Sequence, residues 1–291
     1  MSKPHVAFCG LGLMGAGMAC RLLANGFPLT VYNRSAEKAA ALKTSGAQVA
    51  ATPRDAAAHA QVIFSMVADD AASRSIWLGE NGALAGSTKG AVLVESSTLS
   101  LGWVKELAAA ASAGGCELLD APVTGSKSQA ASGELCFLVG GPAAALEIAR
   151  PAFSAMGRAL IHLGQTGSGA LLKLINNFLC GVQVASLAEA LALIERGGLT
   201  RDQAIEVLTT GAPGSPLLRT LSDRMTARDY TPNFLLRLMA KDLGYAIAEG
   251  QQHLLKLTTA ASALEVFNQS IAAGQGDKDM SAVMEQFRSN V

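Results

Sequence analysis

The change of pattern near residue 164 is the feature that most constrains the fold. Up to that point, short β-branched and aromatic runs alternate with segments of helical spacing. Strand–helix alternation of this kind predicts a doubly wound, mostly parallel sheet with helices on both faces. After Gly164 the strand signals stop and helical spacing continues alone. We therefore predict an α/β domain over residues 1–164 and an all-helical domain over residues 165–291, joined through one long helix.

The expected elements can be placed from these runs and from the glycines and prolines between them. The expected strands cover residues 5–9, 29–32, 48–50, 62–66, 91–95, 116–119, 135–139 and 159–163. In the second half, the expected helices cover residues 173–196, 201–209, 216–227, 233–251, 258–273 and 281–287.

The composition argues against several classes of protein. The 23 basic and 23 acidic residues give a formal net charge of zero, and without a basic stripe we expect no nucleic-acid partner. The five cysteines are scattered without a CxxC pair, and the four histidines are isolated. This usage favours reduced, mostly buried thiols in the cytoplasm and argues against a metal site. The apolar helix after Lys173 carries Asn176 and Asn177, so we expect it to be buried rather than to span a membrane.

A glycine-rich run follows the first expected strand and opens the first expected helix. The run Gly10-Leu11-Gly12-Leu13-Met14-Gly15 fits the pattern G-x-G-x-x-G. In this context Gly10 makes the tight turn, Gly12 lets the backbone approach a pyrophosphate, and Gly15 lets the helix pack closely on the strand. The diphosphate would lie on the helix N-terminus. The run predicts a Rossmann-type, dinucleotide-binding domain.

The residues after the second expected strand indicate which dinucleotide binds. A site for NAD places an acidic residue there to accept a hydrogen bond from the ribose 2′-hydroxyl. This chain has Asn33-Arg34-Ser35 instead. A guanidinium at Arg34 matches a 2′-phosphate as a bidentate, charge-assisted donor, and Asn33 and Ser35 can add neutral hydrogen bonds. The sequence favours NADP(H) over NAD(H), although an arginine at a helix start can also be an ordinary surface residue.

A lysine and an amide interrupt the longest apolar helical run, which begins at residues 167–178. Lys173 and Asn177 are four residues apart, so they share one face of a helix and can converge on one polar group. Polar groups inside an apolar helix are costly unless they are paired or face a cleft. The alternative is that Lys173 extends its ammonium to solvent while its stem packs. Residues elsewhere in the chain decide between the two.

Five stretches, taken in order, resemble the β-hydroxyacid dehydrogenase family, which includes 3-hydroxyisobutyrate dehydrogenase and the glyoxylate/succinic semialdehyde reductases. The stretches are residues 10–15, 120–125 (Asp-Ala-Pro-Val-Thr-Gly), 167–177, 241–243 (Lys-Asp-Leu) and 277–281 (Asp-Lys-Asp-Met-Ser). The resemblance covers essentially the whole chain. It implies an NADP-binding Rossmann-type domain, an all-helical substrate and dimerisation domain, catalysis between the two, and a homodimer or homotetramer.

The resemblance also implies roles for individual residues. Lys173 matches the family's catalytic lysine, and Asn177 matches the amide beside it. Lys241 matches a lysine that approaches the cofactor, and Asp242 matches an acid that supports the active site. The remaining cofactor contacts would come from two loops, Met66-Val67-Ala68 near the adenosine ribose and Ser97-Thr98 near the nicotinamide.

The substrate loop departs from the commonest family pattern. Many members have Ser-Gly-Gly after Pro-Val, whereas this chain has Thr124-Gly125-Ser126 followed by Lys127. The Thr124 hydroxyl can donate to a carboxylate, and the amides of Gly125 and Ser126 can form an anion nest. This form of the loop, and Phe234 ahead of Asp242, are similar to the glyoxylate and succinic semialdehyde reductases. For Phe234, ordinary core packing is an equally open interpretation.

These observations predict an NADP(H)-dependent oxidoreductase that interconverts a small β- or γ-hydroxy acid and its semialdehyde, or glycolate and glyoxylate. The cofactor carries the hydride, and an ammonium at Lys173 can stabilise the developing alkoxide and protonate it. The alternative substrates are 3-hydroxyisobutyrate and tartronate semialdehyde. From another class, the chain could be a non-catalytic dinucleotide-binding scaffold, although relatives that took such a role have lost the lysine.

Overall fold

The chain forms two compact units, each with its own hydrophobic core. The computed structural model describes residues 3–288. One unit ends at Lys173 and the other begins at Leu174, so the division falls inside the long helix α9 (Ser168–Arg196). Two apolar clusters fill the first unit and one fills the second.

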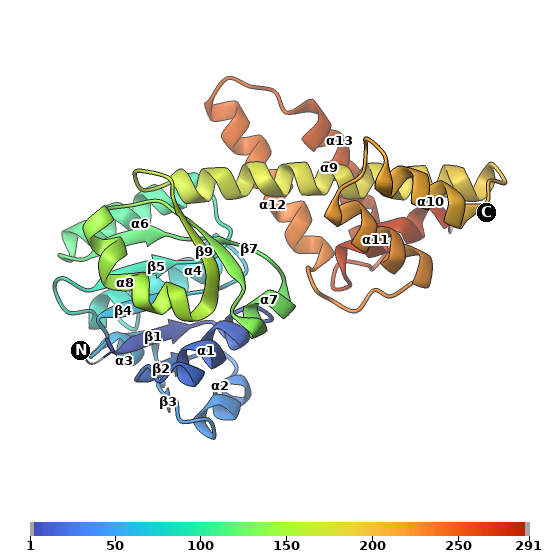
Figure 1. Ribbon diagram of the computed structural model, residues 1–291. Helices are drawn as coiled ribbons and strands as arrows, with labels where there is room; N and C mark the ends of the chain where they lie inside the picture. Colours follow the sequence, from blue (N-terminus) through green and yellow to red (C-terminus); the bar gives the residue numbers. More distant parts are fainter. Residues whose placement is uncertain (1–2, 289–291) are drawn as a thin grey trace. The chain divides into compact units, whose positions relative to one another are not determined.

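Six parallel strands form the main sheet of the first unit (Figure 1). They are β1 (Val6–Cys9), β2 (Leu29–Tyr32), β3 (Gln48–Val49), β4 (Val62–Ser65), β5 (Val92–Glu95) and β6 (Glu117–Asp120). The strand order is β3-β2-β1-β4-β5-β6. After β3 the chain crosses back to the other side of β1, so the winding direction reverses between β1 and β4. The predicted α/β, doubly wound fold is confirmed.

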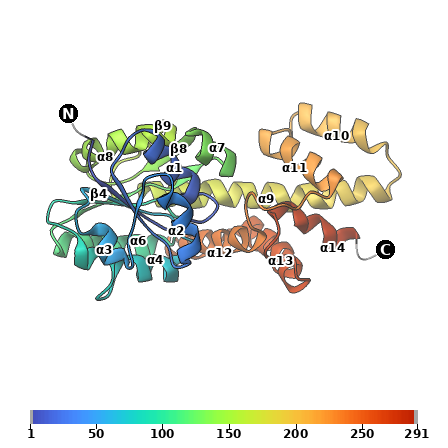
Figure 2. The same ribbon diagram turned by 90° about the horizontal axis from the view of Figure 1, so that it is seen from below.

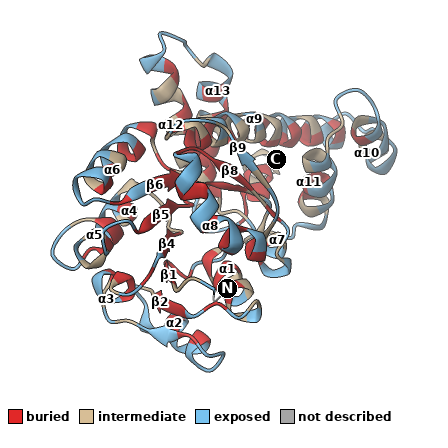
Figure 3. Cartoon of the chain, turned by 60° about the vertical axis from the view of Figure 1, so that its left-hand side comes forward, coloured by how far each residue is buried: buried red, intermediate tan, exposed pale blue. Residues whose placement is uncertain are grey.

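Both faces of this sheet are buried because successive side chains on a strand point to opposite faces. In β1, Val6 and Phe8 lie in one apolar cluster, and Ala7 and Cys9 lie in the other. Figure 3 colours the central strands as buried. A parallel sheet enclosed in this way is encoded by continuous apolar runs, and these are the runs that predicted its strands.

Helices cover the two faces of the main sheet. They are α1 (Gly15–Ala24), α2 (Ala36–Lys43), α3 (Pro53–Ala57), α4 (Asp70–Trp77), α5 (Ala83–Gly86), α6 (Leu101–Ala113), α7 (Lys127–Ser132) and α8 (Ala143–Met156). Residues of α1, α2, α7 and α8 belong to the first apolar cluster, and residues of α3, α4, α5 and α6 belong to the second. Each face of the sheet therefore has its own set of helices.

A second, smaller sheet follows β6 in the chain. It consists of β7 (Val123–Thr124), β8 (Leu135–Val139) and β9 (Gly157–His162), in the order β7-β8-β9 with β7 antiparallel to β8. The expectation that the last two strands continue the main series is wrong, because β8 pairs with β7 and β9. The sequence did not predict β7, since two residues are too few to show an alternating pattern.

The second unit is built from helices around α9. They are α10 (Arg201–Thr210), α11 (Pro216–Ala227), α12 (Leu236–Gln252), α13 (Thr258–Ala272), the 3₁₀ helix η1 (Met280–Met284) and α14 (Glu285–Arg288). Figure 2 shows α10 and α11 on one side of α9 and α12, α13 and α14 on the other. The apolar cluster between them includes Leu191 of α9, Leu243 of α12 and Phe267 of α13.

One buried carboxylate explains two differences from the predicted helices. Asp279 accepts hydrogen bonds from the amides of Asn233 (2.9 Å) and Phe234 (3.1 Å), and α12 begins only at Leu236 rather than at residue 233. The Asp279 side chain also caps the 3₁₀ helix η1, where a single α-helix over residues 281–287 was expected. Contacts between segments distant in sequence therefore set both helix starts.

Helix α9 meets the length and apolarity needed to cross a membrane, the one helix to do so among residues 3–288. Half of its most apolar window is buried inside the protein. Val184, Leu187 and Leu191 of α9 belong to the apolar cluster of the second unit. The apolar face of this part of the helix is thus used for packing.

Candidate functional site

The carboxyl ends of five strands lie in one row at one edge of the main sheet. The register pairs Cys9 with both Tyr32 and Ser65, then Ser65 with Glu95, and Glu95 with Asp120. The loops that follow these residues leave the sheet from the same edge. They contain the predicted cofactor residues 10–15, 33–35, 66–68 and 98. In an open α/β sheet, ligands bind outside this edge, next to the strands between which the winding reverses.

The glycine-rich loop has no room for a side chain at two of its glycines and open space at the third. Gly10 has a φ of 99°, and a Cβ there would overlap the Met66 carbonyl oxygen. A Cβ at Gly15 would overlap the carbonyl oxygen of Gly10, so neither position accepts a side chain. A Cβ at Gly12 would meet no described atom within 4 Å. The Gly12 backbone therefore borders open space, next to a helix start where Met14 provides no side-chain cap among the described contacts.

Asn33 connects the glycine-rich loop to the loop after β2. Its Oδ1 accepts a hydrogen bond from the Leu11 amide at 2.8 Å, and its Nδ2 donates to the Ser35 carbonyl at 2.9 Å. Leu11 is buried, whereas Leu13, Arg34 and Ser35 are exposed. The Asn33 side chain thus supports the loop geometry, while the Arg34 guanidinium is accessible to an anion.

The buried carboxylate of Glu95 holds the next two loops. Its Oε2 accepts hydrogen bonds from the Ser73 hydroxyl (2.6 Å) and the Trp77 indole (2.7 Å), and its Oε1 accepts from the Ser97 amide (2.9 Å). The Ser97 hydroxyl in turn accepts from the Val67 amide at 2.8 Å. Glu95 therefore fixes the loop after β5 and, through Ser97, the loop after β4.

The groups along this part of the edge are partly accessible. Met66, Val67, Ala68 and Thr98 are each half-buried. Cys9 ends the neighbouring strand β1, and burial together with the charge of Glu95 raises the pKa of its thiol to about 12. A thiol in that state is a poor nucleophile, so the polar character of the edge comes from main-chain amides and hydroxyl groups.

The predicted substrate loop leaves β7 and enters α7. Thr124 is half-buried, and Gly125 is exposed with a φ of 113°. Ser126 forms a capping box, in which its amide donates to Oε1 of Gln129 at 2.9 Å. An anion bound to the Ser126 amide would have to displace Gln129, whereas the Thr124 hydroxyl carries no such constraint in the described contacts of residues 3–288.

Asp120 fixes the start of α9, the helix that carries Lys173. Its Oδ1 accepts a hydrogen bond from the Gly167 amide (2.7 Å), and its Oδ2 accepts from the Ala170 amide (2.8 Å). A Cβ at Gly169 would lie 2.7 Å from the Asp120 carbonyl oxygen, so the helix start packs directly on the end of β6. Lys173 follows within one turn and is half-buried. A buried carboxylate thus anchors the helical turn that precedes this lysine.

The second unit brings three of the predicted residues together. The Asn177 side chain donates to Oδ2 of Asp242 at 2.5 Å, and both residues are buried. The Lys241 ammonium pairs with Oδ1 of Asp242 at 2.9 Å and lies 4.7 Å from the centre of the Tyr245 ring. Phe234 packs half-buried against the apolar cluster of this unit, in agreement with the core-packing interpretation.

Sequence reasoning assigned no role to the two carboxylates that organise the sheet edge. Burial raises the pKa of both Glu95 and Asp120, and the hydrogen bonds that they accept oppose this rise. Each is the last residue of a short apolar strand, β5 or β6. An acidic residue at the end of an apolar strand can be recognised in the sequence. It predicts a carboxylate that organises its neighbours, because a buried carboxylate needs several hydrogen-bond donors.

The polar groups at the edge suit an organic, phosphate-bearing cofactor. The glycine-rich loop and the start of α1 offer main-chain amides, which bind phosphate oxygens. Within residues 3–288, no group of three or more His, Cys, Asp or Glu side chains could hold a metal ion. A dinucleotide is therefore the cofactor whose parts the described residues fit.

Two family models match the chain, one on each side of Gln165. Residues 5–164 match the model described as the NAD binding domain of 6-phosphogluconate dehydrogenase. Residues 167–287 match the model described as "NAD-binding of NADP-dependent 3-hydroxyisobutyrate dehydrogenase". Together the two models cover most of both units.

Relatives of similar length share about a third of the sequence. The chain is 34% identical over 281 residues to glyoxylate/succinic semialdehyde reductase 1 of Arabidopsis thaliana, covering 97% of each chain. It is 36% identical over 290 residues to the NAD-dependent L-serine dehydrogenase of Pseudomonas aeruginosa, again covering 97% of each. Among solved structures, 3-hydroxyisobutyrate dehydrogenase from Salmonella typhimurium is 32% identical with a TM-score of 0.89, covering 97% of this chain and 99% of that one.

Proposed function

Since this chain belongs to the β-hydroxyacid dehydrogenase family, we propose that it is an NADP(H)-dependent oxidoreductase of small hydroxy acids and their semialdehydes, or of glycolate and glyoxylate. The observation that carries the proposal is the placement of Lys173, one turn beyond the helix start that the Asp120 carboxylate holds. The names of the relatives support a substrate that combines a carboxylate with a nearby hydroxyl or carbonyl group.

Arg34 supports the preference for NADP(H). It directly follows Asn33 at the end of β2, where an NAD site would have an acid, and its side chain is exposed. Its guanidinium can make paired, charge-assisted bonds to a 2′-phosphate, and Ser35 can add a neutral donor. Gly12 and the start of α1 would receive the pyrophosphate, and the loops 66–68 and 97–98 would flank the ribose and the nicotinamide.

Lys173 is the proposed proton donor. The dinucleotide supplies the hydride when it is bound. The ammonium of Lys173 stabilises negative charge that develops on the carbonyl oxygen and then protonates it; in the reverse direction the neutral amine removes the proton. Asn177 lies one turn further along α9 and orients the oxygen or the ammonium without competing for the proton. Its amide is in turn fixed by Asp242, which also holds Lys241.

The acid end of the substrate would meet the loop after β7. The Thr124 hydroxyl is half-buried and can donate to a carboxylate oxygen, and the Gly125 amide can add a second bond. The Ser126 amide could bind the carboxylate only after its hydrogen bond to Gln129 breaks. Phe234, which matches an aromatic residue near the substrate in the reductases that the sequence resembles, would limit the substrate to a short aldehyde-acid.

Two substitutions of Lys173 test its role. Lys173→Ala should lower kcat by about 10²–10⁴-fold, the usual contribution of general acid catalysis, while the Kd for NADPH stays within about twofold. Lys173→Arg keeps the positive charge but does not release its proton near neutral pH, so it should lose turnover to a similar extent. Lys105→Ala, on an exposed position of α6, is the matched control. Near-wild-type turnover in Lys173→Ala would overturn the assignment.

A substrate panel tests the reaction class. NADPH and NADH oxidation should be followed with glyoxylate, succinic semialdehyde, tartronate semialdehyde and methylmalonate semialdehyde. Turnover of at least one, with NADPH preferred, supports the proposal, and the panel ranks the substrates directly. Tight binding of NADPH without turnover of any substrate would instead favour a non-catalytic scaffold.

We also propose that the chain forms a homodimer or homotetramer. Ile175, Leu179 and Leu193 are large apolar side chains exposed on α9. Exposed apolar groups on one helix are usually covered by a partner, and a second copy is the commonest one. Light scattering at micromolar concentration measures the subunit number, and a monomer would contradict this part of the proposal.

A further inference from the structure

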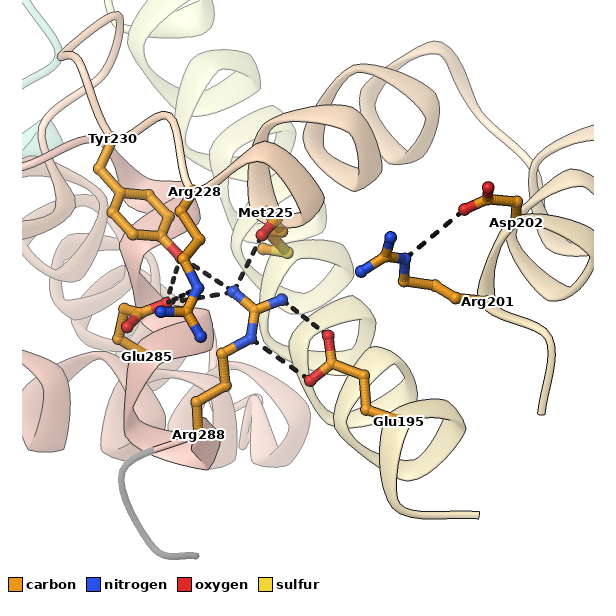
Figure 4. Close-up of polar contacts among 8 residues, drawn as sticks. All are labelled: Glu195, Arg201, Asp202, Met225, Arg228, Tyr230, Glu285 and Arg288. Carbon is orange, nitrogen blue, oxygen red and sulfur yellow. Dashed lines mark hydrogen bonds and ion pairs between the residues drawn. The ribbon is translucent and has the colours of Figure 1, made fainter. Parts of the chain in front are cut away.

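The second unit contains a cavity of about 560 Å³, lined in part by charged side chains, that the proposed reaction does not use. It lies among the end of α9, the start of α10, the end of α11 and α14. Figure 4 shows Glu195, Arg201, Arg228 and Arg288 of its lining with their polar contacts. On α9, Glu195 lies 18 positions beyond Asn177, which corresponds to about 27 Å along the helix axis. The cavity is therefore separate from the Asn177–Asp242 pair.

Positive groups are in excess around this cavity. Its lining includes one carboxylate, Glu195, and four guanidiniums, those of Arg196, Arg201, Arg228 and Arg288. Even when the two further carboxylates that touch these arginines, Asp202 and Glu285, are counted, four cations face three anions. In a chain of zero net charge, such a concentration of arginine indicates an anionic ligand.

One of these arginines, Arg288, is held by several hydrogen bonds to other residues of the protein. Arg288 donates to Glu195 at 2.7 Å, to Glu285 at 3.1 Å and to the Met225 carbonyl at 2.9 Å. The hydrogen bond to Glu195 is the main cause that raises the pKa of Arg288 above its ordinary value. The Arg288 guanidinium is therefore a fixed part of the cavity wall, and its charge is balanced by Glu195 and Glu285.

Two other arginines hold their partners only loosely. The closest contact of Arg201 to Asp202 is 3.5 Å, and that of Arg228 to Glu285 is 3.9 Å. The two arginine side chains are 45% and 64% exposed. Exposed ion pairs at such distances stabilise a protein very little, so an incoming anion can draw these guanidiniums away from their present partners.

The backbone and an unsatisfied hydroxyl add to this evidence. Among residues 3–288, the buried Oγ1 of Thr226 has no hydrogen-bond partner. An unpaired buried hydroxyl is unfavourable. Thr226 lines the cavity, and a rotation of its side chain would bring this covered hydroxyl to a ligand oxygen. Arg228 caps α11 in the left-handed conformation with a φ of 53°, where glycine or asparagine is usual. Arg201 begins α10, whose N-terminal amides add partial positive charge.

We propose that this cavity binds a small phosphate-bearing anion, held between Arg201 and Arg228 with a hydrogen bond from Thr226. A tetrahedral phosphate has enough acceptor oxygens for two guanidiniums and one hydroxyl approaching from different directions. The volume exceeds what one phosphate ion fills, so a phosphate ester of a small metabolite also fits. Both share the same recognition chemistry.

The test is calorimetric titration of the NADPH-saturated enzyme, so that the dinucleotide already fills the phosphate positions of the glycine-rich loop. Inorganic phosphate and glycerol 3-phosphate are titrated separately at constant ionic strength. We expect one ligand per chain and a Kd on the order of 0.1–1 mM for the better ligand. Affinity at least tenfold higher for glycerol 3-phosphate identifies a phosphate ester, and equal affinity identifies free phosphate.

Variants separate this cavity from other phosphate positions. Arg201→Ala and Arg228→Ala should each weaken binding by about tenfold or more, and Thr226→Val by about fivefold. Arg219→Ala removes an exposed arginine of α11 outside the cavity and should leave the affinity unchanged. An affinity that survives the double variant Arg201→Ala/Arg228→Ala would overturn the proposal, as would the lack of saturable binding by either ligand up to about 10 mM.

Discussion

The two units build their polar sites in different ways. In the first unit, Glu95 and Asp120 end neighbouring strands and accept hydrogen bonds from main-chain amides and neutral side chains. In the second unit, Asp242 and Glu195 pair with the cations of Lys241 and Arg288. The first arrangement fixes backbone, and the second fixes side chains.

This difference bears on what each site can do. Loops held by amide-to-carboxylate bonds keep one geometry, because the amides cannot turn away without a change in the backbone. That suits a cofactor with many fixed contacts. Side-chain ion pairs can exchange partners, because long cationic side chains rotate at little cost. Such side chains suit a site that binds a substrate, transfers a proton or binds a phosphate-bearing anion.

The largest effect on stability is expected for Asp120→Asn. Asparagine offers one acceptor oxygen, so its NH₂ group would face the amide of Gly167 or of Ala170, and a buried donor would lose its partner. We expect the free energy of unfolding of the first unit to fall by about 2–4 kcal/mol and kcat to fall by about 10–100-fold. Tryptophan fluorescence isolates this unit, since Trp77 and Trp103 are the only tryptophans in the sequence.

The matched control for that variant is Glu117→Gln. Glu117 starts the same strand, β6, but is exposed. The Glu117→Gln variant also replaces a carboxylate by an amide, but at a position that does not contact the start of α9. If both variants unfold alike, or if Asp120→Asn keeps full turnover, the Asp120 carboxylate does not anchor the start of α9.

The next largest effect is one on binding: Arg34→Asp should change the affinity for the cofactor and leave stability unchanged. Charge-assisted bonds contribute about 1.5–3 kcal/mol, so the Kd for NADPH should rise by about 10–150-fold while the Kd for NADH falls. Because Arg34 is exposed, unfolding should be unchanged. Lys38→Asp, an equal change of charge at an exposed position of α2, is the control. A preference for NADPH that survives Arg34→Asp would refute the cofactor argument.

Asp242→Asn should be milder than Asp120→Asn, although both acids are buried. The new side chain can still accept from Asn177, and Lys241 keeps its contact with the Tyr245 ring. We expect the free energy of unfolding, measured by circular dichroism, to fall by about 1–2 kcal/mol. A loss larger than that of Asp120→Asn would show that the ion-paired site is the more rigid one and would reverse the comparison.

The fold was largely predictable because its signals are local. The apolar runs of β1, β2, β4 and β5 and the glycine-rich loop each lie within one short stretch, and so do Lys173 and Asn177 on one helix face. The resemblance added Lys241 and Asp242, and the structure places Asn177 beside that pair. The prediction of mostly buried thiols was only partly right, since Cys20 is exposed.

The roles of Glu95 and Asp120 were not predictable in this way. Asp120 and the Gly167 amide that it accepts from are 47 residues apart in sequence, and Ser73 and Glu95 are 22 apart. Such partners meet only through the strand register and the crossover helices. The same holds for Asp279, which delays α12 from 46 residues away. No periodicity carries this information, because it arises from tertiary contacts.

The smallest expected effect is a difference in pH dependence between Glu95 and Glu195. Burial raises the pKa of Glu95 above its ordinary value of 4.5. Between 4.5 and the raised pKa, the folded chain binds more protons than the unfolded one, so the contribution of Glu95 to stability falls as pH rises. The hydrogen bond from Arg288 lowers the pKa of Glu195. Between the lowered pKa and 4.5, the unfolded chain binds more protons, so the contribution of Glu195 is full above pH 4.5 and is lost below it.

Glu95→Gln and Glu195→Gln remove these titrations one at a time. The stability of the wild type minus that of Glu95→Gln should decrease as pH rises, whereas the difference for Glu195→Gln should increase and level off at about 1 kcal/mol. Denaturant unfolding from about pH 3.5 to pH 7.5 gives both curves, with tryptophan fluorescence for the first unit and circular dichroism for the chain. Two curves of the same slope would mean that the donors around Glu95 outweigh its burial. The carboxylates of the two units would then be held by the same balance of forces, and their partners alone would distinguish them.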